Sequence, residues 1–344
     1  MRLRRVSPTS PGLHRVRRGR GFAYVDAAGR VVSDEATRAR IDALVLPPAW
    51  EDVWICPVAS GHIQATGVDA AGRRQYRYHD HWRVARDLEK HERVLDFGAI
   101  LPAVRARVCD DLAGDGLTRQ RVLSCAVRLL DLGFFRIGSE QYATQNQTFG
   151  LATMRKEHVT VSKGVVTFDY VAKSGKQRVQ SLVEPEVGDV VAALKRRRGG
   201  GDELLAYRDG DRWVDVKSAD INAHLRELSG GDFSAKDFRT WSATVLAAVG
   251  LAVSTDVTSV TARKQAVTRV VKEVAHYLGN TPAVCRSSYI DPRIIDLYDN
   301  GTTIAKDLKL LGDGTTYGQP ATQGAVEGAV LRLLRAPAQQ ALAG

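Results

Sequence analysis

Residues 278–289 read LGNTPAVCRSSY, and this stretch joins the end of a predicted helix to a tyrosine. The chain before it repeats apolar side chains at helical spacing, at Ala262, Ala266, Val270, Val274 and Leu278. Gly279 is suited to ending that helix, because glycine adopts a left-handed backbone conformation without steric cost. Tyr289 follows Asn280 by nine residues. The stretch therefore predicts a helical region that presents an amide and a phenol close together in the sequence.

Helical spacing extends over most of the chain beyond about residue 90. Thr118 and Gly133 bound one predicted helix, and Ser234 with Asp237 resembles the capping box of another. An amphipathic stretch over residues 326–334 predicts a last helix. This helical part is interrupted by three predicted strands that short turns connect, at residues 159–162, 165–172 and 177–183.

The N-terminal part of the chain is instead rich in short strand-like runs. These runs and one hairpin turn lie at residues 22–26, 53–56, 62–67 and 69–73. A length of 344 residues exceeds the usual size of one domain. We therefore predict an α+β protein. A small β-rich domain spans residues 1–90, and a larger, mainly α-helical domain with the three-stranded hairpin sheet spans residues 91–344.

The composition favours a polyanionic partner. Hydrophobic residues make up 44% of the chain, enough for a packed core, and the net charge is +10. Such a charge favours nucleic acid first and an acidic membrane surface second. No apolar run approaches the roughly 18 residues that a membrane span requires. Residues 1–20 contain seven arginines and no acidic residue. With no apolar core behind them they do not predict a secretory signal; a loose basic arm on phosphates and a solvated tail both remain open.

The cysteines and histidines argue against a metal site. Cys56, Cys109, Cys125 and Cys285 are widely spaced, which suits a reducing cytoplasm and does not match zinc-ligand spacing. The His79-Asp80-His81 cluster is more typical of a polar surface than of a metal centre. We expect neither a metal nor another cofactor.

A tyrosine can attack a phosphodiester only with help, because its pKa of about 10 leaves about one side chain in a thousand ionised at neutral pH. Arg136 and Arg239 are suited to giving that help, since a guanidinium offers paired donors to two phosphate oxygens. Those oxygens become more negative in the pentacoordinate transition state. One such donor typically contributes about 3 kcal/mol to its stabilisation.

The remaining steps need an acid and a neutral donor. Lys173, at the tip of the second predicted hairpin, can protonate the leaving 5′-oxygen as a general acid. Asn280 can donate a hydrogen bond to a nonbridging oxygen. Because a phosphotyrosyl bond stores the energy of the broken bond, the strand can be rejoined without ATP or metal.

Each fragment by itself also has an ordinary structural explanation. An arginine that ends an apolar helix is usually a surface or ion-pair residue, and the Lys173-Ser174-Gly175-Lys176 turn is common hairpin sequence. A tyrosine before Ile290 is most often a packing residue. Their joint occurrence in the order Arg, Lys, Lys-x-x-Arg, Asn, Tyr favours a DNA strand-transfer site.

That order resembles the type IB DNA topoisomerases, in particular their compact poxvirus-like branch found in bacteria, over roughly residues 20–300. Residues 134–138, FFRIG, are similar to the first arginine motif of the family, and residues 236–240, KDFRT, to its Lys-Asp-Leu-Arg-Thr motif. Lys173 lies on the hairpin of the family, and Tyr289 matches its nucleophile. One departure is Asn280, where poxvirus and eukaryotic members have histidine. His276 is a rival for this role, although its spacing to Tyr289 disfavours it.

The resemblance implies a fold and an activity. A β-rich domain and a catalytic domain of the type IB topoisomerase/tyrosine recombinase kind would clamp duplex DNA. One strand would be cut through a 3′-phosphotyrosyl link, the free end would swivel, and religation would relax supercoils of either sign. We expect a cytoplasmic, nucleoid-associated monomer, because the clamp needs one chain.

The resemblance also implies DNA contacts outside the catalytic residues. The family uses a DNA-facing sheet, which residues 64–78 resemble, and its second arginine motif begins at a lysine. The residues expected to contact DNA are Gln64, Arg73, Arg74, Tyr76, Tyr78 and Lys236. Side chains of these types can reach base edges in the major groove or phosphates. The alternative for the sheet residues is an exposed, polar strand edge.

Two other functions remain as alternatives. A tyrosine recombinase uses the same covalent link, but usually has His-x-x-Arg where this chain has Lys236-Asp237-Phe238-Arg239, and a helical domain where we predict strands. A non-enzymatic basic DNA-binding protein would keep its affinity and salt dependence when Tyr289 is replaced.

Overall fold

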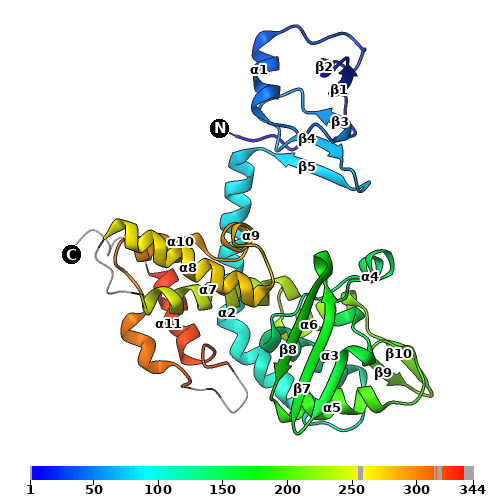
Figure 1. The fold of residues 1–344 in the computed structure, drawn as a ribbon, viewed down its shortest axis with the longest axis vertical. Helices are drawn as coiled ribbons and strands as arrows, with labels where there is room; N and C mark the ends of the chain where they lie inside the picture. Colours follow the sequence, from blue (N-terminus) through cyan, green and yellow to red (C-terminus); the bar gives the residue numbers. More distant parts are fainter. Residues whose placement is uncertain (1, 255–258, 314, 316–319, 337–344) are drawn as a thin grey trace. The chain divides into compact units, whose positions relative to one another are not determined.

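The computed structural model describes residues 2–254, 259–313, 315 and 320–336. The chain divides into two compact units, Met1–Glu92 and Arg93–Gly344, which Figure 1 draws as a ribbon. Within the described residues, no helix combines the length and the apolar composition that crossing a membrane would require.

The first unit is built on one antiparallel sheet of order β2-β1-β3-β4-β5. Its elements are β1 (Leu13–Arg18), β2 (Gly21–Val25), α1 (Glu35–Ala43), β3 (Glu51–Ile55), β4 (Ile63–Val68) and β5 (Arg74–Tyr78). A small core lies between α1 and the sheet, where Ile41 packs with Val53, Ile55 and Ala65. The basic N-terminal segment is therefore not a loose arm beyond residue 13, because β1 hydrogen-bonds to both β2 and β3.

The second unit is mainly helical. Its longer helices are α2 (Asp80–Leu112, which starts in the first unit), α3 (Arg119–Gly133), α5 (Pro185–Arg196), α6 (Ser218–Ser229), α7 (Ala235–Ala252), α8 (Val260–Leu278) and α11 (Ala325–Arg335). Shorter helices are α4 (Glu140–Asn146), α9 (Pro282–Ser288) and α10 (Pro292–Asp299), with 3₁₀ turns η1 (Leu151–Thr153), η2 (Lys156–His158), η3 (Lys173–Gly175) and η4 (Ala305–Leu310).

The predicted three-stranded sheet is present in this helical unit. Antiparallel strands β6 (Val159–Ser162), β7 (Val165–Ala172) and β8 (Lys176–Leu182) lie in the order β6-β7-β8, and α5 packs against β6 and β7 (Figure 1). A separate hairpin of β9 (Ala206–Asp209) and β10 (Arg212–Asp215) was not predicted. The fold class is thus confirmed: a small β-rich region precedes a mainly helical region that contains a three-stranded antiparallel sheet.

The local signals for helix ends also agree with the structure. The Thr118 side chain accepts a hydrogen bond from the Arg121 amide at 3.2 Å and caps α3. Ser234 and Asp237 form a capping box at the start of α7, in which the Ser234 amide donates to the Asp237 carboxylate at 2.9 Å. Gly279 ends α8 in the left-handed conformation, with φ of 63°.

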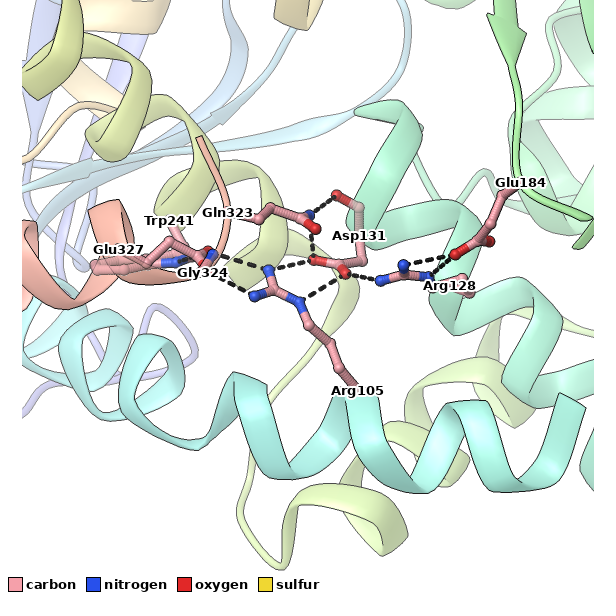
Figure 2. Close-up of polar contacts among 8 residues, drawn as sticks. All are labelled: Arg105, Arg128, Asp131, Glu184, Trp241, Gln323, Gly324 and Glu327. Carbon is pink, nitrogen blue, oxygen red and sulfur yellow. Dashed lines mark hydrogen bonds and ion pairs between the residues drawn. The ribbon is translucent and has the colours of Figure 1, made fainter. Parts of the chain in front are cut away.

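A buried network of charges connects α11 to three other elements of the core (Figure 2). Arg105 of α2 donates to Asp131 of α3 at 2.9 Å and to Glu327 of α11 at 3.0 Å. The indole of Trp241 on α7 donates to Glu327 at 2.7 Å. Trp241 is only 1% exposed and lies in the same helix as Arg239. The network therefore holds α7 in the core through the buried indole.

The same network reaches the hairpin sheet. Arg128 of α3 is 1% exposed and donates to Asp131 at 2.8 Å and to Glu184, the residue directly before α5, at 2.6 Å. Replacing one member of a buried ion pair typically costs about 3–5 kcal/mol, since the other charge is left without its partner. The network therefore holds α3 in place relative to α2 and the hairpin sheet. The end of α3 leads to Arg136.

Candidate active site

Arg136 lies on the extended segment that follows α3. Phe134 adopts the left-handed conformation, with φ of 53°, and the chain turns away from the helix there. Phe135 is fully buried and packs edge-on against Phe168 of β7, with ring centroids 4.9 Å apart. The carbonyl of Arg136 accepts a hydrogen bond from the Leu151 amide at 2.9 Å. The backbone of Arg136 is therefore held on both sides, and its half-buried side chain projects from a rigid segment.

A close contact between two glycines supports this segment. Gly138 has φ of 85°, in the region that favours glycine. A Cβ on Gly150 would lie 2.4 Å from the Gly138 Cα, so any side chain there would push the Arg136 segment away. The small residue at each position allows the two backbones to approach directly.

Lys173 lies in the turn between β7 and β8. The turn includes Ser174 in the left-handed conformation, with φ of 68°. The Lys173 side chain is exposed, and no polar contact to another described residue holds it. A cation of this kind can move to meet a group that enters the cleft.

Arg239 lies one turn into α7 and is only 3% exposed. Its guanidinium donates to the carbonyl of Phe134 and, at 2.8 Å, to the carbonyl of Leu278. Its Nε has no hydrogen-bond partner among the described residues. Burial and the nearby charge of Arg136 lower the pKa of Arg239 to about 10. The side chain therefore still carries a charge at neutral pH and retains a donor for a further acceptor.

Asn280 follows the end of α8 and contacts the first arginine. Its side-chain oxygen accepts a hydrogen bond from Nη2 of Arg136, which also donates to the Gly279 carbonyl at 3.1 Å. The amide nitrogen Nδ2 is buried and has no partner among the described residues. An unused buried donor costs free energy unless a ligand or water binds it. Asn280 thus offers a donor beside Arg136.

Tyr289 is half-buried at the end of α9, and its ring lies 5.2 Å from the guanidinium carbon of Arg239. Burial raises the pKa of the phenol, but the charges of Arg239, Arg136 and Lys236 outweigh burial, and the net pKa is lowered. A lowered pKa makes the phenolate more accessible, which is what attack on phosphorus needs.

One cleft brings these side chains together. Residues from five segments of the second unit line it, among them Arg136, Lys173, Lys236, Arg239 and Tyr289. A second, overlapping pocket shares the two arginines and Lys173, and adds Lys176, Arg178, His276 and Asn280. His276 is exposed, whereas Asn280 contacts Arg136 directly. The five residues predicted as catalytic thus lie around two adjoining pockets that share Arg136, Lys173 and Arg239.

Sequence reasoning missed Arg178, which lines the second pocket. It lies on β8, two residues after Lys176 and two before Gln180, so these three side chains share one face of the strand. The alternation of Lys176, Arg178 and Gln180 was visible in the sequence. It could indicate a site residue only once the face of the hairpin that lies towards Arg136 and Arg239 was known.

In the first unit the expected DNA contacts lie in different surroundings. Gln64 is 4% exposed, and its Nε2 donates to the carbonyls of Ala59 at 2.9 Å and Gly61 at 2.6 Å. Its Oε1 accepts a hydrogen bond from Arg40 at 3.1 Å. The side chain therefore makes its hydrogen bonds inside the unit and is too buried to contact a DNA base, contrary to the prediction for Gln64.

The other four residues lie on or beside β5. Arg73 pairs with Asp69 at 2.8 Å and Arg74 with Asp52 at 3.0 Å, and both arginines are largely exposed. The rings of Tyr76 and Tyr78 stack with centroids 5.9 Å apart, and Tyr76 is 46% exposed. Arg73, Arg74 and Tyr76 are thus accessible cations and an accessible ring, whereas Tyr78 also packs against a small apolar cluster of the first unit.

Comparisons with known proteins identify the class. The model of the catalytic core of eukaryotic DNA topoisomerase I matches residues 79–310, and that of the N-terminal domain of bacterial DNA topoisomerase IB matches residues 21–69. A DNA topoisomerase 1B of Acanthamoeba polyphaga mimivirus is 30% identical over 297 residues, 84% of this chain and 88% of the viral protein.

More distant relatives have the same description. A DNA topoisomerase 1B of vaccinia virus (strain Copenhagen) is 18% identical over 257 residues, 74% of this chain and 77% of that protein. A DNA topoisomerase 1 of Daucus carota is 26% identical over 159 residues, which are 46% of this chain but 19% of that longer protein.

The chain belongs to the type IB DNA topoisomerase family. It is therefore an isomerase that acts on DNA by breaking and rejoining a strand, and both the predicted family and the predicted enzyme class are confirmed. None of these matches favours a recombinase or a DNA-binding protein without activity.

Proposed function

We propose that this topoisomerase cuts one strand of duplex DNA with Tyr289, holds the broken strand as a 3′-phosphotyrosine, and rejoins it after the free end has turned. The observation that carries this proposal is the cleft in which Arg136, Arg239 and Lys173 surround a tyrosine of lowered pKa. Supercoils of either sign relax in this scheme, because swivelling has no preferred direction.

In the cleavage step the Tyr289 oxygen attacks phosphorus. A bond forms between the phenolic oxygen and phosphorus while the bond to the 5′-oxygen breaks, and the phenolic proton passes to solvent. Arg136 and Arg239 donate to the nonbridging oxygens, whose negative charge grows in the transition state. Their positions near Tyr289 are set before DNA arrives, so little reorganisation is needed during the reaction.

The leaving group takes its proton from Lys173. The exposed ammonium reaches the 5′-oxygen from the hairpin turn and donates a proton as the bond to phosphorus breaks. In religation the 5′-hydroxyl returns its proton to Lys173 and attacks the phosphotyrosine, which releases Tyr289. Atoms and charge balance without a nucleotide or a metal ion.

Asn280 supplies the neutral donor of the site. Its buried Nδ2 donates to a nonbridging oxygen next to the donors of Arg136. Where family members have histidine, the amide retains the hydrogen bond and lacks the positive charge.

The two domains share the binding of DNA. Residues 1–90 act as a DNA-binding domain through Arg73, Arg74, Tyr76 and Tyr78, and residues 91–344 act as the catalytic domain, with Lys236 on a phosphate beside the cut. A single chain clamps the duplex as a monomer, in the cytoplasm at the nucleoid. Exposed cations and stacked rings on β5 support the first part of this assignment.

The test is relaxation of negatively supercoiled plasmid in EDTA without ATP, with wild-type protein beside Tyr289→Phe. Relaxation by the wild type alone supports the proposal, since the variant keeps the ring and loses only the nucleophile. If the variant relaxes the plasmid equally well, Tyr289 is not the nucleophile. If both proteins bind the plasmid and neither relaxes it, the proposed mechanism is wrong.

A further inference from the structure

The last turn of α8 is held by three guanidinium groups on successive carbonyls. Arg178 donates to the carbonyl of Tyr277, Arg239 to that of Leu278 at 2.8 Å, and Arg136 to that of Gly279 at 3.1 Å. Two of these arginines belong to the proposed catalytic set. Arg178 does not, and it takes no part in the proposed reaction.

Cations at this point have a simple physical effect. The last carbonyls of a helix lack partners within the helix, and the helix end has partial negative charge. Each guanidinium therefore gains a charge-assisted hydrogen bond there. Asn280 is the next residue along the chain, so the position of its amide depends on how firmly this turn is held.

Arg178 also contacts the glycine that ends the helix. A Cβ on Gly279 would lie 2.7 Å from Nη1 of Arg178, so the guanidinium packs directly against the backbone of that residue. Gly279 has φ of 63°, which already favours glycine, and the contact with Arg178 adds a second reason for its small size.

On its other side Arg178 connects to the end of α3. Its Nε donates to Oε1 of Gln180 at 3.1 Å, and Nε2 of Gln180 donates to the carbonyl of Gly133. Gly133 is the last residue of α3 and lies three positions before Arg136. Two neighbouring side chains of β8 thus link the helix end that leads to Arg136 with the helix end that leads to Asn280.

We propose that Arg178, supported by Gln180, is a positioning residue for strand cleavage, which holds the end of α8 so that the Asn280 amide meets the transferred phosphate. This inference rests on the proposed function. Arg178 acts through Asn280 and touches neither the phosphate nor the tyrosine. A loss of alignment of about 1 Å at a catalytic group typically costs about a hundredfold in rate.

The test is a double-mutant cycle on single-turnover cleavage of a short duplex that traps the covalent adduct. Arg178→Ala is combined with Asn280→Ala, and each protein is compared with wild type. We expect Arg178→Ala alone to slow cleavage about tenfold to a hundredfold. In the Asn280→Ala background the same change should slow it less than about threefold, because the group on which Arg178 acts is already absent. Equal losses in the two backgrounds overturn the proposal.

Two further variants distinguish a positioning role of Arg178 from a general effect on folding. Gln180→Ala should also slow cleavage, by a smaller factor, and Arg178→Lys should recover part of the rate, since lysine can replace some but not all of the hydrogen bonds of the guanidinium. The matched control is Arg212→Ala, an exposed arginine on β10, for which we expect a wild-type rate. Failure of Arg178→Lys to exceed Arg178→Ala counts against the proposal.

DNA affinity gives the remaining readout. A residue that touches a phosphate contributes about one unit to the slope of log affinity against log salt, so its loss lowers that slope. We expect Arg178→Ala to leave the slope and the affinity unchanged, and a lowered slope would make Arg178 a direct DNA contact and overturn the positioning role.

The covalent adduct distinguishes failure of the proposed function from failure of the role of Arg178. If wild-type protein forms no adduct that Tyr289→Phe lacks, the proposed function itself is wrong. If it forms one and the rate losses of Arg178→Ala and Asn280→Ala are additive, only the role of Arg178 is wrong.

Discussion

The side-chain oxygen of Asn280 accepts a hydrogen bond from Arg136, and this contact fixes the orientation of the Asn280 amide. The amide nitrogen is then a buried donor that has no partner among the described residues. The two residues are 144 positions apart in the sequence. Arg136 therefore sets the orientation of the neutral donor in addition to binding phosphate in the proposed mechanism.

Asn280→Asp tests this orientation with almost no change of shape. The aspartate can keep the contact with Arg136, but it has no N–H to donate and adds a negative charge near the phosphate. We expect cleavage to slow by a hundredfold or more, measured as the rate of covalent adduct formation. Asn280→His should retain activity, since an imidazole can donate in the same direction. Near-wild-type cleavage by Asn280→Asp would show that the donor is not used.

Arg136→Ala and Arg239→Ala should each slow cleavage by about a hundredfold or more, because each removes a donor from the charge that develops in the transition state. The same adduct assay gives the rate, and thermal unfolding shows whether the variant remains folded. Rates within threefold of wild type would exclude the residue concerned from catalysis.

Lys173→Ala should be rescued by a substrate with sulfur in place of the bridging 5′-oxygen. A thiolate leaves without protonation, so the general acid is no longer needed. We expect the variant to cleave the sulfur substrate at close to the wild-type rate and the normal substrate about a hundredfold or more slowly. Absence of rescue would transfer the role to Lys176, which lines the second pocket.

The ionisation of Tyr289 should depend on nearby cations. Arg239, Arg136 and Lys236 lower its pKa by stabilising the phenolate, so loss of one cation must raise that pKa and reduce the ionised fraction at a given pH. We expect Lys236→Ala to move the titration midpoint to higher pH, and Lys163→Ala, in the turn between β6 and β7, to leave it in place. The measurement is the ultraviolet absorbance titration of each protein minus that of its Tyr289→Phe counterpart. A midpoint that does not move in Lys236→Ala would contradict the electrostatic explanation.

Glu327 should contribute strongly to stability. Glu327→Ala removes an acceptor from the buried Trp241 indole and from the largely buried Arg105, which keeps its contact with Asp131, and we expect a loss of about 1–3 kcal/mol in the free energy of unfolding, measured with urea. Glu327→Gln should lose less, since it retains an acceptor for the indole. The control on the same helix is Arg332→Ala, which breaks an exposed ion pair with Asp307 at 3.1 Å and should cost under about 1 kcal/mol. Equal losses from Glu327→Ala and Arg332→Ala would rule out a special role for the network.

Features of the fold that depend on neighbouring residues could be predicted from the sequence. The caps at Thr118 and Ser234 and the end of α8 at Gly279 follow from local hydrogen bonds and backbone preferences. The three strands of the hairpin sheet were predicted to within a residue, because their alternation and turns are local as well. The long helix α2 and the hairpin β9–β10 were not predicted as separate elements, although the buried residues of α2 recur at helical spacing, at Val94, Phe97, Leu101, Val104, Val108 and Leu112.

Features that depend on distant partners were predicted poorly. Gln64 has the sequence context of an exposed strand, yet Arg40 and two carbonyls hold it inside the first unit. The basic segment before residue 13 continues into β1, which pairs with β3 through residues about forty positions apart in the sequence, His14 with Trp54 and Leu13 with Ile55. In each case the surroundings of the residues were decided by a partner that no local pattern identifies.

The sequence by itself determined which chemical groups are present and in what order: an arginine, a lysine, a Lys-x-x-Arg pair, an amide and a tyrosine. It also determined the start of α3 at Thr118, the start of α7 at Ser234 and the end of α8 at Gly279, because capping is a local interaction. Only the tertiary structure decided that Arg136 contacts Asn280, that Arg239 lies against Tyr289, and that Arg178 holds the turn before Asn280. Those contacts join residues about fifty to more than a hundred positions apart. The packing of α3, α7, α8 and β8 brings them within hydrogen-bond distance, and no short stretch of sequence encodes that packing.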